Sequence, residues 1–190
     1  MARIIPTPDG RPTRPPQWHQ AKLDRQVLKS LMRRTDRQGI IDFALWLALL
    51  AGSFWLAVTS WGSWWAVPAF LLYGTIWSSA DARWHECGHA TVFKTRWLNE
   101  ACYHLSSYMT LREAHLWRWS HARHHTHPVI KGRDPEIQVR RPADLLAILL
   151  DFLHLKGGPA EIKKLFAHAM GRIDDEVKDY VPASERPKMI

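Results

Sequence analysis

The chain has 190 residues, a formal net charge of +8 at pH 7, 11 tryptophans and two cysteines. Two cysteines are too few for the disulfide framework that stabilises small secreted proteins. The positive charge flanks apolar segments and belongs to no recognisable nucleic-acid-binding module, so it indicates a membrane surface and argues against nucleic acid as a partner.

Residues 1–39 are polar and rich in proline, with nine Lys or Arg residues against three acidic ones. They lack the apolar core that a signal peptide requires. We therefore expect them to stay in the mature chain as a cytoplasmic N-terminal arm.

An uncharged segment follows, in which the 38 residues from Phe43 to Ala80 include no Asp, Glu, Lys, Arg or His. One membrane-spanning helix needs about 20 apolar residues, so this length predicts two spans. The letters WGSWW at 61–65 supply a turn and interfacial aromatic rings. We expect a transmembrane helical hairpin over residues 40–80. Lys and Arg are in excess on both flanks, so the positive-inside rule places both flanks in the cytoplasm of a multi-pass integral membrane protein.

Beyond the hairpin the sequence predicts helices and no strands. Residues 81–137 hold most of the histidines and form the expected cytoplasmic histidine-box region. Residues 138–170 combine a short apolar run with an amphipathic one, which predicts interfacial helices. Residues 171–190 are acidic and contain proline, and we expect an exposed tail. The predicted fold class is all-α, an integral membrane helical hairpin followed by a cytoplasmic-side helical, His-rich cap.

The first candidate site is the pentapeptide HECGH at residues 85–89. On a helix His85 and His89 share one face, because they are four residues apart. The same letters spell the signature of zinc peptidases, in which Glu86 would act as general base. They also contain a Glu-x-x-His pair of the kind used by carboxylate di-iron bundles. The pentapeptide alone therefore leaves the metal open.

The second candidate site is HARHHTH at residues 121–127. A helix would direct His121, His124 and His125 towards one region, because they are spaced by three and four residues. A zinc peptidase has no use for three further histidines, and a carboxylate bundle needs glutamates that this cluster lacks. More than four imidazoles indicate two metal ions, and iron, copper, nickel and zinc all accept this ligand.

The other histidines lack such a pattern. His127 lies off the face of the second cluster and is a candidate to support a ligand indirectly. We expect ordinary interfacial polar residues at four positions, His104, His115, His154 and His168.

Three segments, HECGHATVFKTRWLN, WRWSHARHHTHP and GRDPEI, resemble the first two histidine-box regions of integral-membrane fatty acid desaturases. That superfamily also includes alkane and carotenoid hydroxylases. The resemblance covers residues 40–137 and includes the preceding hairpin. It implies that five histidines are ligands of a di-iron centre on the cytoplasmic side, namely His85, His89, His121, His124 and His125. Glu86, Asp134 and Glu136 are candidates to hydrogen-bond these imidazoles.

The activity implied by the resemblance is O₂-dependent insertion of a double bond into a fatty acyl chain, with two iron ions as cofactor. A separate electron donor such as a ferredoxin or a cytochrome is implied, because no other cofactor motif is present. Trp77, Trp84 and Trp117 are candidates to line a slot for the acyl chain.

A third histidine box, expected in this family, is missing after Pro128. We therefore expect the chain to be the N-terminal part of such an enzyme. The sequence leaves three alternatives open: a membrane di-iron hydroxylase of the alkane or carotenoid type, a non-catalytic truncated membrane fragment, and a zinc peptidase with Asp151 as a further ligand.

Overall fold

The computed structural model describes residues 23–130, 132–137, 142–152, 155 and 157–190. Four features of the sequence lie outside the described residues: positions 1–22 of the N-terminal arm, positions 138–141 of the interfacial segment, His154, and the side chain of Asp151. The chain divides into two units, Met1–Arg33 and Arg34–Ile190.

In the first unit the described residues form one short helix, α1 (Arg25–Leu31). The Asp24 carboxylate accepts hydrogen bonds from the backbone N–H groups of Gln26 and Val27, at 2.8 and 3.0 Å. Such a cap satisfies amide groups that the first turn of a helix leaves without partners. No residue of α1 is buried.

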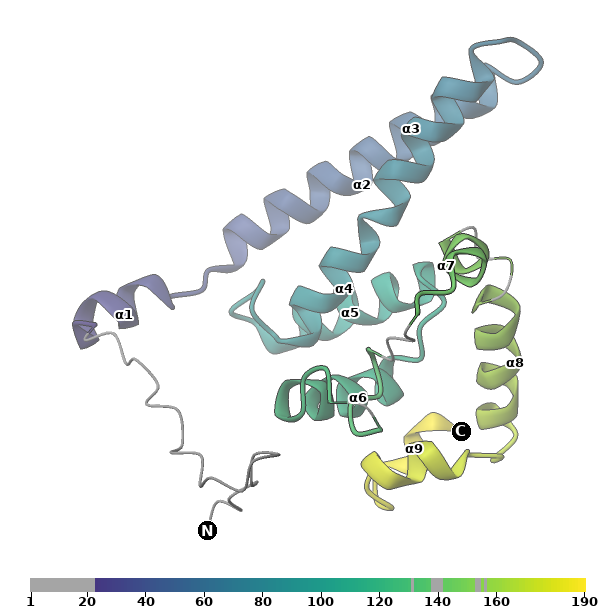
Figure 1. The fold of residues 1–190 in the computed structure, drawn as a ribbon. Helices are drawn as coiled ribbons and strands as arrows, with labels where there is room; N and C mark the ends of the chain where they lie inside the picture. Colours follow the sequence, from purple (N-terminus) through teal and green to yellow (C-terminus); the bar gives the residue numbers. More distant parts are fainter. Residues whose placement is uncertain (1–22, 131, 138–141, 153–154, 156) are drawn as a thin grey trace. The chain divides into compact units, whose positions relative to one another are not determined.

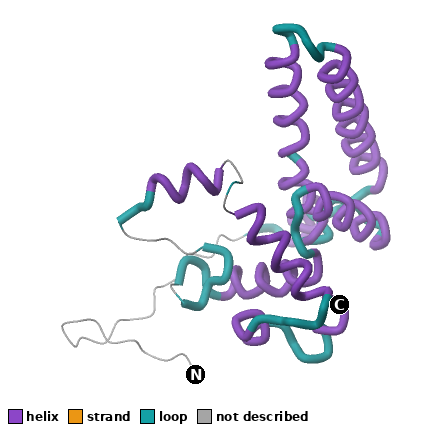
Figure 2. Tube along the Cα trace, turned by 90° about the vertical axis from the view of Figure 1, so that its right-hand side faces the viewer, coloured by secondary structure: helices purple, strands orange, loops and turns teal. Residues whose placement is uncertain are grey.

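The second unit begins with two antiparallel helices, α2 (Asp36–Thr59) and α3 (Ala66–Ser78), that pack along each other (Figures 1 and 2). The turn between them exposes three indole rings, those of Trp61, Trp64 and Trp65. Both helices also expose apolar side chains on their outer surfaces. A helix that is apolar all round is typical of a membrane environment.

One helical stretch among the described residues is long and apolar enough to cross a membrane. It runs Arg25–Thr59, and its uncharged residues from Phe43 onward belong to α2. Helix α3 has 13 residues and is about 20 Å long, shorter than the roughly 30 Å of a bilayer core. The all-α class is confirmed, with no strand among the described residues. The second membrane span stays a prediction.

The His-rich region consists of three helices, α4 (Ala80–Gly88), α5 (Arg96–Met109) and α6 (Ala114–Thr126). The loop between α4 and α5 is held by the buried Asn99 side chain, which accepts a hydrogen bond from the N–H of Phe93 and donates one to its C=O, at 3.1 and 2.8 Å. The Asp36 carboxylate at the start of α2 accepts hydrogen bonds from the N–H and the hydroxyl of Thr95. The loop is therefore fixed to both the hairpin and α5.

One apolar core connects the hairpin with the histidine-box helices. Phe43 and Trp46 of α2 belong to the same buried cluster as Trp84, Tyr103 and Trp117 of the three following helices. The indole N–H of Trp46 donates to the C=O of Ile76 in α3, at 3.2 Å, so the buried nitrogen has a partner. Because α4 and α6 share these rings, the core fixes one histidine box relative to the other.

The remaining elements are α7 (Leu145–Phe152), α8 (Gly157–Ala169), α9 (Asp175–Tyr180) and a 3₁₀ helix (Arg186–Met189). A small second core packs three of the last residues, Val177, Val181 and Met189, against Leu116 of α6. The segment 171–190 is therefore not simply an exposed tail. Val177 and Val181 are four residues apart and present one apolar face, which the acidic composition obscures.

Asn99→Ala is expected to lower the free energy of unfolding by about 1–3 kcal/mol, because it leaves buried backbone groups of the α4–α5 loop without partners. Thermal unfolding in detergent measures this change. Thr91→Ala is the control: its hydroxyl is exposed and donates to the C=O of Glu86 at the same loop, so we expect a change within about 0.5 kcal/mol. Equal stability of the two variants would contradict the proposed role of Asn99.

Candidate metal centre

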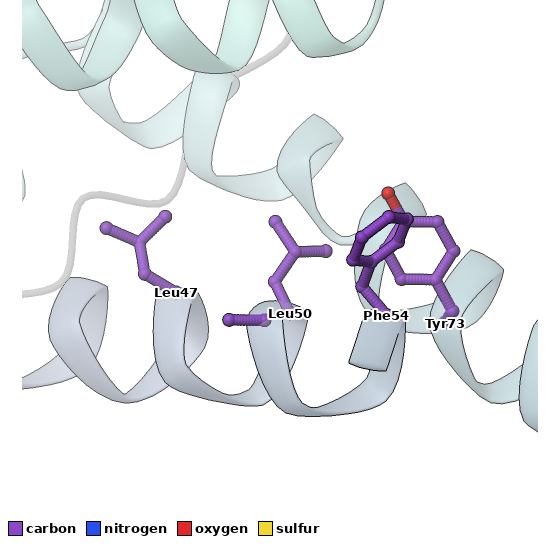
Figure 3. Close-up of a pocket in the computed structure, with 5 residues that line it drawn as sticks. Leu47, Leu50, Phe54 and Tyr73 are labelled. Carbon is purple, nitrogen blue, oxygen red and sulfur yellow. The ribbon is translucent and has the colours of Figure 1, made fainter. Parts of the chain in front are cut away.

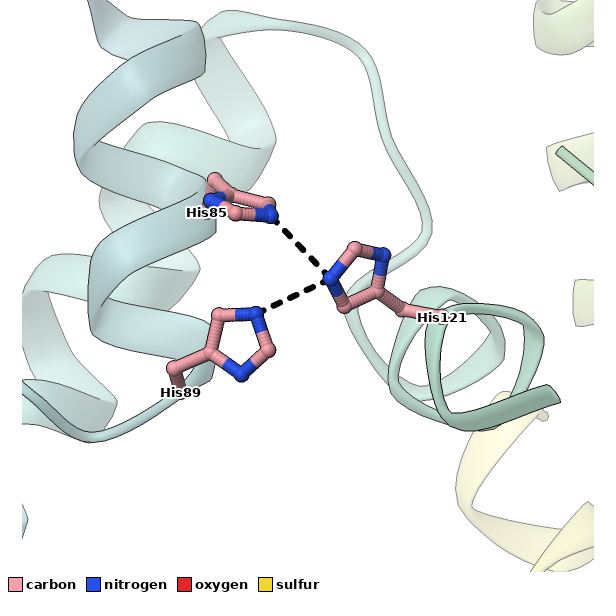
Figure 4. Close-up of side chains that lie close together, drawn as sticks. All are labelled: His85, His89 and His121. Carbon is pink, nitrogen blue, oxygen red and sulfur yellow. Dashed lines mark hydrogen bonds between the residues drawn. The ribbon is translucent and has the colours of Figure 1, made fainter. Parts of the chain in front are cut away.

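The first histidine box lies at the C-terminal end of α4. His85 occupies the last turn, and His89 is the capping residue, whose N–H donates to the C=O of His85 at 3.2 Å. His85 is half-buried and His89 is exposed. The helix ends immediately afterwards, and Ala90 has a φ of 55°. Both imidazoles thus project from the same end of the helix towards α6 (Figure 4).

The second histidine box occupies the last turns of α6, where His121 is buried. Its Nε2 atom lies 3.0 Å from Nε2 of His85, 2.9 Å from Nε2 of His89 and 3.0 Å from Nε2 of His125. Figure 4 shows the contacts to the two histidines of α4. Of the five histidines in the two boxes, three therefore place their Nε2 atoms within 3.0 Å of the Nε2 of His121.

His124 lies at the side of this group. Its ring centroid is 5.7 Å from the centroids of both His121 and His125. Its Nδ1 atom lies 2.9 Å from a carboxylate oxygen of Asp134. With Nδ1 donating to the carboxylate, Nε2 is the nitrogen that remains available to bind a metal.

The nitrogens of His85, His89 and His121 lie within 4.8 Å of one another and fit a metal ion better than a hydrogen-bonded cluster. One Nε2 atom offers either one proton or one lone pair, so the Nε2 of His121 cannot form hydrogen bonds with three imidazoles at once. Two nitrogens that bind one ion at about 2.1 Å and at right angles lie about 3.0 Å apart. The three separations around His121 agree with that value. Nitrogen donors of this kind suit iron, copper, nickel or zinc.

The electrostatic environment keeps the imidazoles ready for a metal. Burial lowers the pKa of His85, His89 and His121 below the ordinary value, and neighbouring imidazoles lower it further. Glu136 opposes this effect at His121 without reversing it. These rings are therefore uncharged at neutral pH, and the uncharged imidazole is the form that binds metal.

Two carboxylates support the imidazoles from behind. Glu136 accepts a hydrogen bond from Ser120 at 3.1 Å and lies 2.9 Å from Nδ1 of His121. Asp134 contacts His124 and also accepts hydrogen bonds from backbone N–H groups, including that of Val129 at 2.7 Å. Burial acts to raise the pKa of Asp134, but these hydrogen bonds outweigh it and hold the pKa well below its usual range. The loop after α6 thus orients both rings.

Glu86 lies elsewhere. It is exposed, and within the described part of the chain no hydrogen bond joins it to any of the five boxed imidazoles. In a zinc peptidase the glutamate of the same pentapeptide acts beside the metal. The position of Glu86 therefore argues against that reading of HECGH.

The four other described histidines have different environments. His127 lines a small pocket of about 250 Å³ between α6 and α9, away from the cluster. His104 is exposed, and its ring centroid is 5.7 Å from that of His115. His168 is fully buried, and its Nδ1 lies 2.6 Å from Glu113. It is therefore not an interfacial residue. In the sequence, the spacing of three residues from Leu165 places His168 on the same face of α8 as that apolar side chain, which could have indicated its burial.

The tryptophans proposed for a substrate slot lie in the core. Trp84 and Trp117 are buried in it, and Trp77 is partly buried and donates its indole N–H to the C=O of Met109 at 3.1 Å. A groove of about 350 Å³ lies instead on the hairpin (Figure 3), where it is lined by Leu47, Leu50, Ala51, Phe54 and Tyr73. None of the three tryptophans lines it.

Comparison with known proteins assigns this centre to a family. The model of the family described as "Fatty acid desaturase" matches residues 62–181, more than half of the chain. The chain belongs to the fatty acid desaturase family. The matched segment contains both histidine boxes and the loop that carries Asp134 and Glu136. No solved structure matches the chain.

Several curated desaturases are similar to this one. The chain is 36% identical over 78 residues to an sn-1 acyl-lipid omega-3 desaturase (ferredoxin) of Nostoc sp., covering 40% of this chain and 22% of the relative. It is 39% identical over 84 residues to the protein of the same description from Synechocystis sp., covering 44% and 23%. Human fatty acid desaturase 3 is 31% identical over 93 residues, covering 45% and 20%. The aligned segments span about a fifth of each relative.

Asp134→Ala is expected to weaken metal binding about 10- to 100-fold, because the loop loses its buried carboxylate and His124 loses the group that orients it. Asp134→Asn keeps an oxygen acceptor without the charge, and we expect an intermediate loss. Titration of the purified protein with Co²⁺ measures both. Asp179→Ala is the control, since this exposed carboxylate of α9 pairs with Arg123 of α6, the helix that carries His124. Equal affinities in Asp134→Ala and Asp179→Ala would show that Asp134 has no such role.

Proposed function

We propose that this desaturase-family chain supplies the first two histidine boxes of an O₂-dependent acyl-lipid desaturase, and that its five boxed histidines hold iron. The observation that carries the proposal is the approach of three Nε2 atoms to the Nε2 of His121, with separations of 2.9 to 3.0 Å. Its support is chemical, because several imidazoles brought together from two helices form a donor set that suits a transition metal.

The five histidines divide into two groups in this proposal. Three of them, His85, His89 and His121, have ligand atoms within 4.8 Å of one another and can share one ion, and His125 adds a nitrogen 3.0 Å from that of His121. His124 is displaced to the side, and its free Nε2 is suited to a second ion. Two ions are thus compatible with the ligands present, and the number of imidazoles exceeds the needs of one ion.

Bound iron would activate O₂, the oxidant that removes hydrogen from an unactivated methylene, which no side-chain acid or base achieves. The residues of the chain have other tasks. Glu136 and Asp134 accept the Nδ1 protons of His121 and His124 and so direct the Nε2 lone pairs away from the carboxylates. The buried rings of Trp84 and Trp117 exclude water from one side of the histidine cluster.

The substrate and the partners follow from the setting of the site. Helix α2 is suited to a membrane, and the aromatic turn and the exposed leucines of α7 are suited to its interface, so the substrate is an acyl chain of a membrane lipid. We infer a hairpin over residues 40–80 with both flanks in the cytoplasm. Relatives carry "ferredoxin" in their descriptions, and we propose a donor of that kind here, with a cytochrome as the other candidate.

Replacement of any of five residues by Ala is expected to lower the Fe²⁺ bound by the purified protein at least tenfold, because each loss leaves an ion short of a ligand. The five are His85, His89, His121, His124 and His125. Metal analysis after anaerobic loading measures the effect. His104→Ala and Glu86→Ala are controls, expected to bind within twofold of wild type. Zinc at one ion per chain, retained in His121→Ala, would contradict the proposal.

The membrane topology has its own test. Reporter domains fused after residue 38 and after residue 140 are expected on the cytoplasmic side, because basic residues flank the uncharged segment at both ends. Protease protection and reporter activity in intact cells measure the side. Reporters on opposite sides would contradict the hairpin and leave a single span.

A further inference from the structure

The indole of Trp117 contacts histidines of both boxes. It stacks on the imidazole of His121, with ring centroids 4.2 Å apart and planes 19° apart. The rings of His85 and His89 stand nearly perpendicular to it, at centroid distances of 5.7 and 6.4 Å and angles of 69° and 75°. Trp117 is 7% exposed, so it is a core side chain that reaches the metal ligands.

Gly88 provides the space for this indole. A methyl group at Gly88 would lie 2.4 Å from Cζ3 and 3.1 Å from Cη2 of Trp117, and 3.1 Å from Cε2 of Tyr103. Carbon atoms do not approach to 2.4 Å, so any other residue would displace the indole. Gly88 has no positive φ, so backbone conformation does not explain it. A helical glycine costs about 1 kcal/mol relative to alanine, and here a close contact accounts for it.

The indole has little freedom to move away. Trp84 and Tyr103 pack against it within the same buried cluster. A methyl group at Gly88 would therefore shift the indole along its contact with His121. The hydrogen bond from Nδ1 of His121 to Glu136 fixes one atom of that imidazole, but a single hydrogen bond leaves the ring plane free to rotate. The stacked indole restricts that rotation.

We propose that Trp117 is a positioning residue for the metal centre, and that Gly88 within HECGH is required because it admits the Trp117 indole between the two boxes. Stacking sets the plane of His121, and the contact of the indole with Gly88 sets how closely α4 and α6 approach there. This inference rests on the metal-binding function proposed above. It assigns a role to the fourth letter of the pentapeptide, which binds no metal.

The contact between Gly88 and Trp117 can be tested by combining a larger residue at position 88 with a smaller one at position 117. Trp117→Phe keeps an aromatic ring beside His121 but removes the outer atoms that a methyl group at Gly88 would meet. We expect Gly88→Ala to weaken Co²⁺ binding at least tenfold and Trp117→Phe to weaken it at most threefold. The double variant should recover to within threefold of Trp117→Phe. Trp117→Leu, which fills space without stacking, should lose at least tenfold.

Helical glycines elsewhere in the chain provide matched controls. A methyl group at Gly52 or at Gly74 would meet nothing within 4 Å. Gly52→Ala and Gly74→Ala are therefore expected to bind Co²⁺ as wild type does. They show what an added methyl group does to helix stability without a contact to the metal centre.

The visible absorption of bound Co²⁺ separates positioning from simple destabilisation, because it reports ligand geometry at saturating metal. The spectrum should change in Gly88→Ala and Trp117→Leu and return to the wild-type shape in the double variant. A wild-type spectrum and affinity in Gly88→Ala would overturn the inference, and so would a double variant as impaired as Gly88→Ala alone.

The proposed metal-binding function and the proposed contact between Gly88 and Trp117 can be contradicted by different results. A wild-type protein that binds no Co²⁺ would contradict the metal centre. The unfolding temperature of the metal-free variants would then still report the contact: recovery in the double variant would support the fit of Trp117 against Gly88, and its absence would overturn it.

Discussion

The packing of one indole between two helices determines the geometry of the whole histidine cluster. His85 and His121 are 36 positions apart in the sequence, yet their Nε2 atoms approach to 3.0 Å because α4 and α6 meet around Trp117. A larger residue at position 88 would separate the helices, and a smaller residue at position 117 would leave a cavity. The hairpin contributes Phe43 and Trp46 to the same cluster, so the hairpin and the histidine cluster share one core.

Uncharged and charged side chains occupy different positions around the cluster. The imidazoles of His85, His89 and His121 are uncharged at neutral pH, because burial lowers their pKa. Two carboxylates, Asp134 and Glu136, stand behind the imidazoles and lie close enough to balance part of the charge of a cation. The carboxylates thus control how the rings are oriented.

Local spacing explains what the sequence could predict. Separations of three and four residues place histidines on one helix face, so both boxes and the all-α class followed from periodicity. The resemblance to desaturases also indicates Asp134 and Glu136 as candidates to contact the imidazoles, and each lies 2.9 Å from an imidazole nitrogen. The Nε2 atoms of His85, His89 and His125 lie within 3.0 Å of that of His121, as expected if the two boxes face each other. Whether these histidines bind iron stays a prediction. The desaturase or hydroxylase reaction and the membrane topology likewise stay predictions.

Other features depend on contacts between residues far apart in the chain. The buried pair of His168 and Glu113 spans 55 residues, and one histidine on an amphipathic helix gives no sign of its partner. The packing of Val177 and Val181 on α6 could not be predicted, because the acidic composition of residues 171–190 indicates an exposed segment. Glu86 was linked to the site by sequence proximity, but the helix turns its side chain outwards. Trp84 and Trp117 were assigned to a substrate slot because aromatic residues suit both interfaces and cores, and composition alone does not separate these environments.

X-ray absorption at the iron edge of the anaerobically loaded protein tests the central claim most directly, because it identifies the atoms bound to iron. We expect a first shell of light donors at about 2.1 Å, with the outer-shell scattering that imidazole rings produce. A shell that contains sulfur would implicate Cys87 or Cys102. A shell dominated by carboxylate oxygen, without imidazole scattering, would contradict the claim that the two histidine boxes hold the metal.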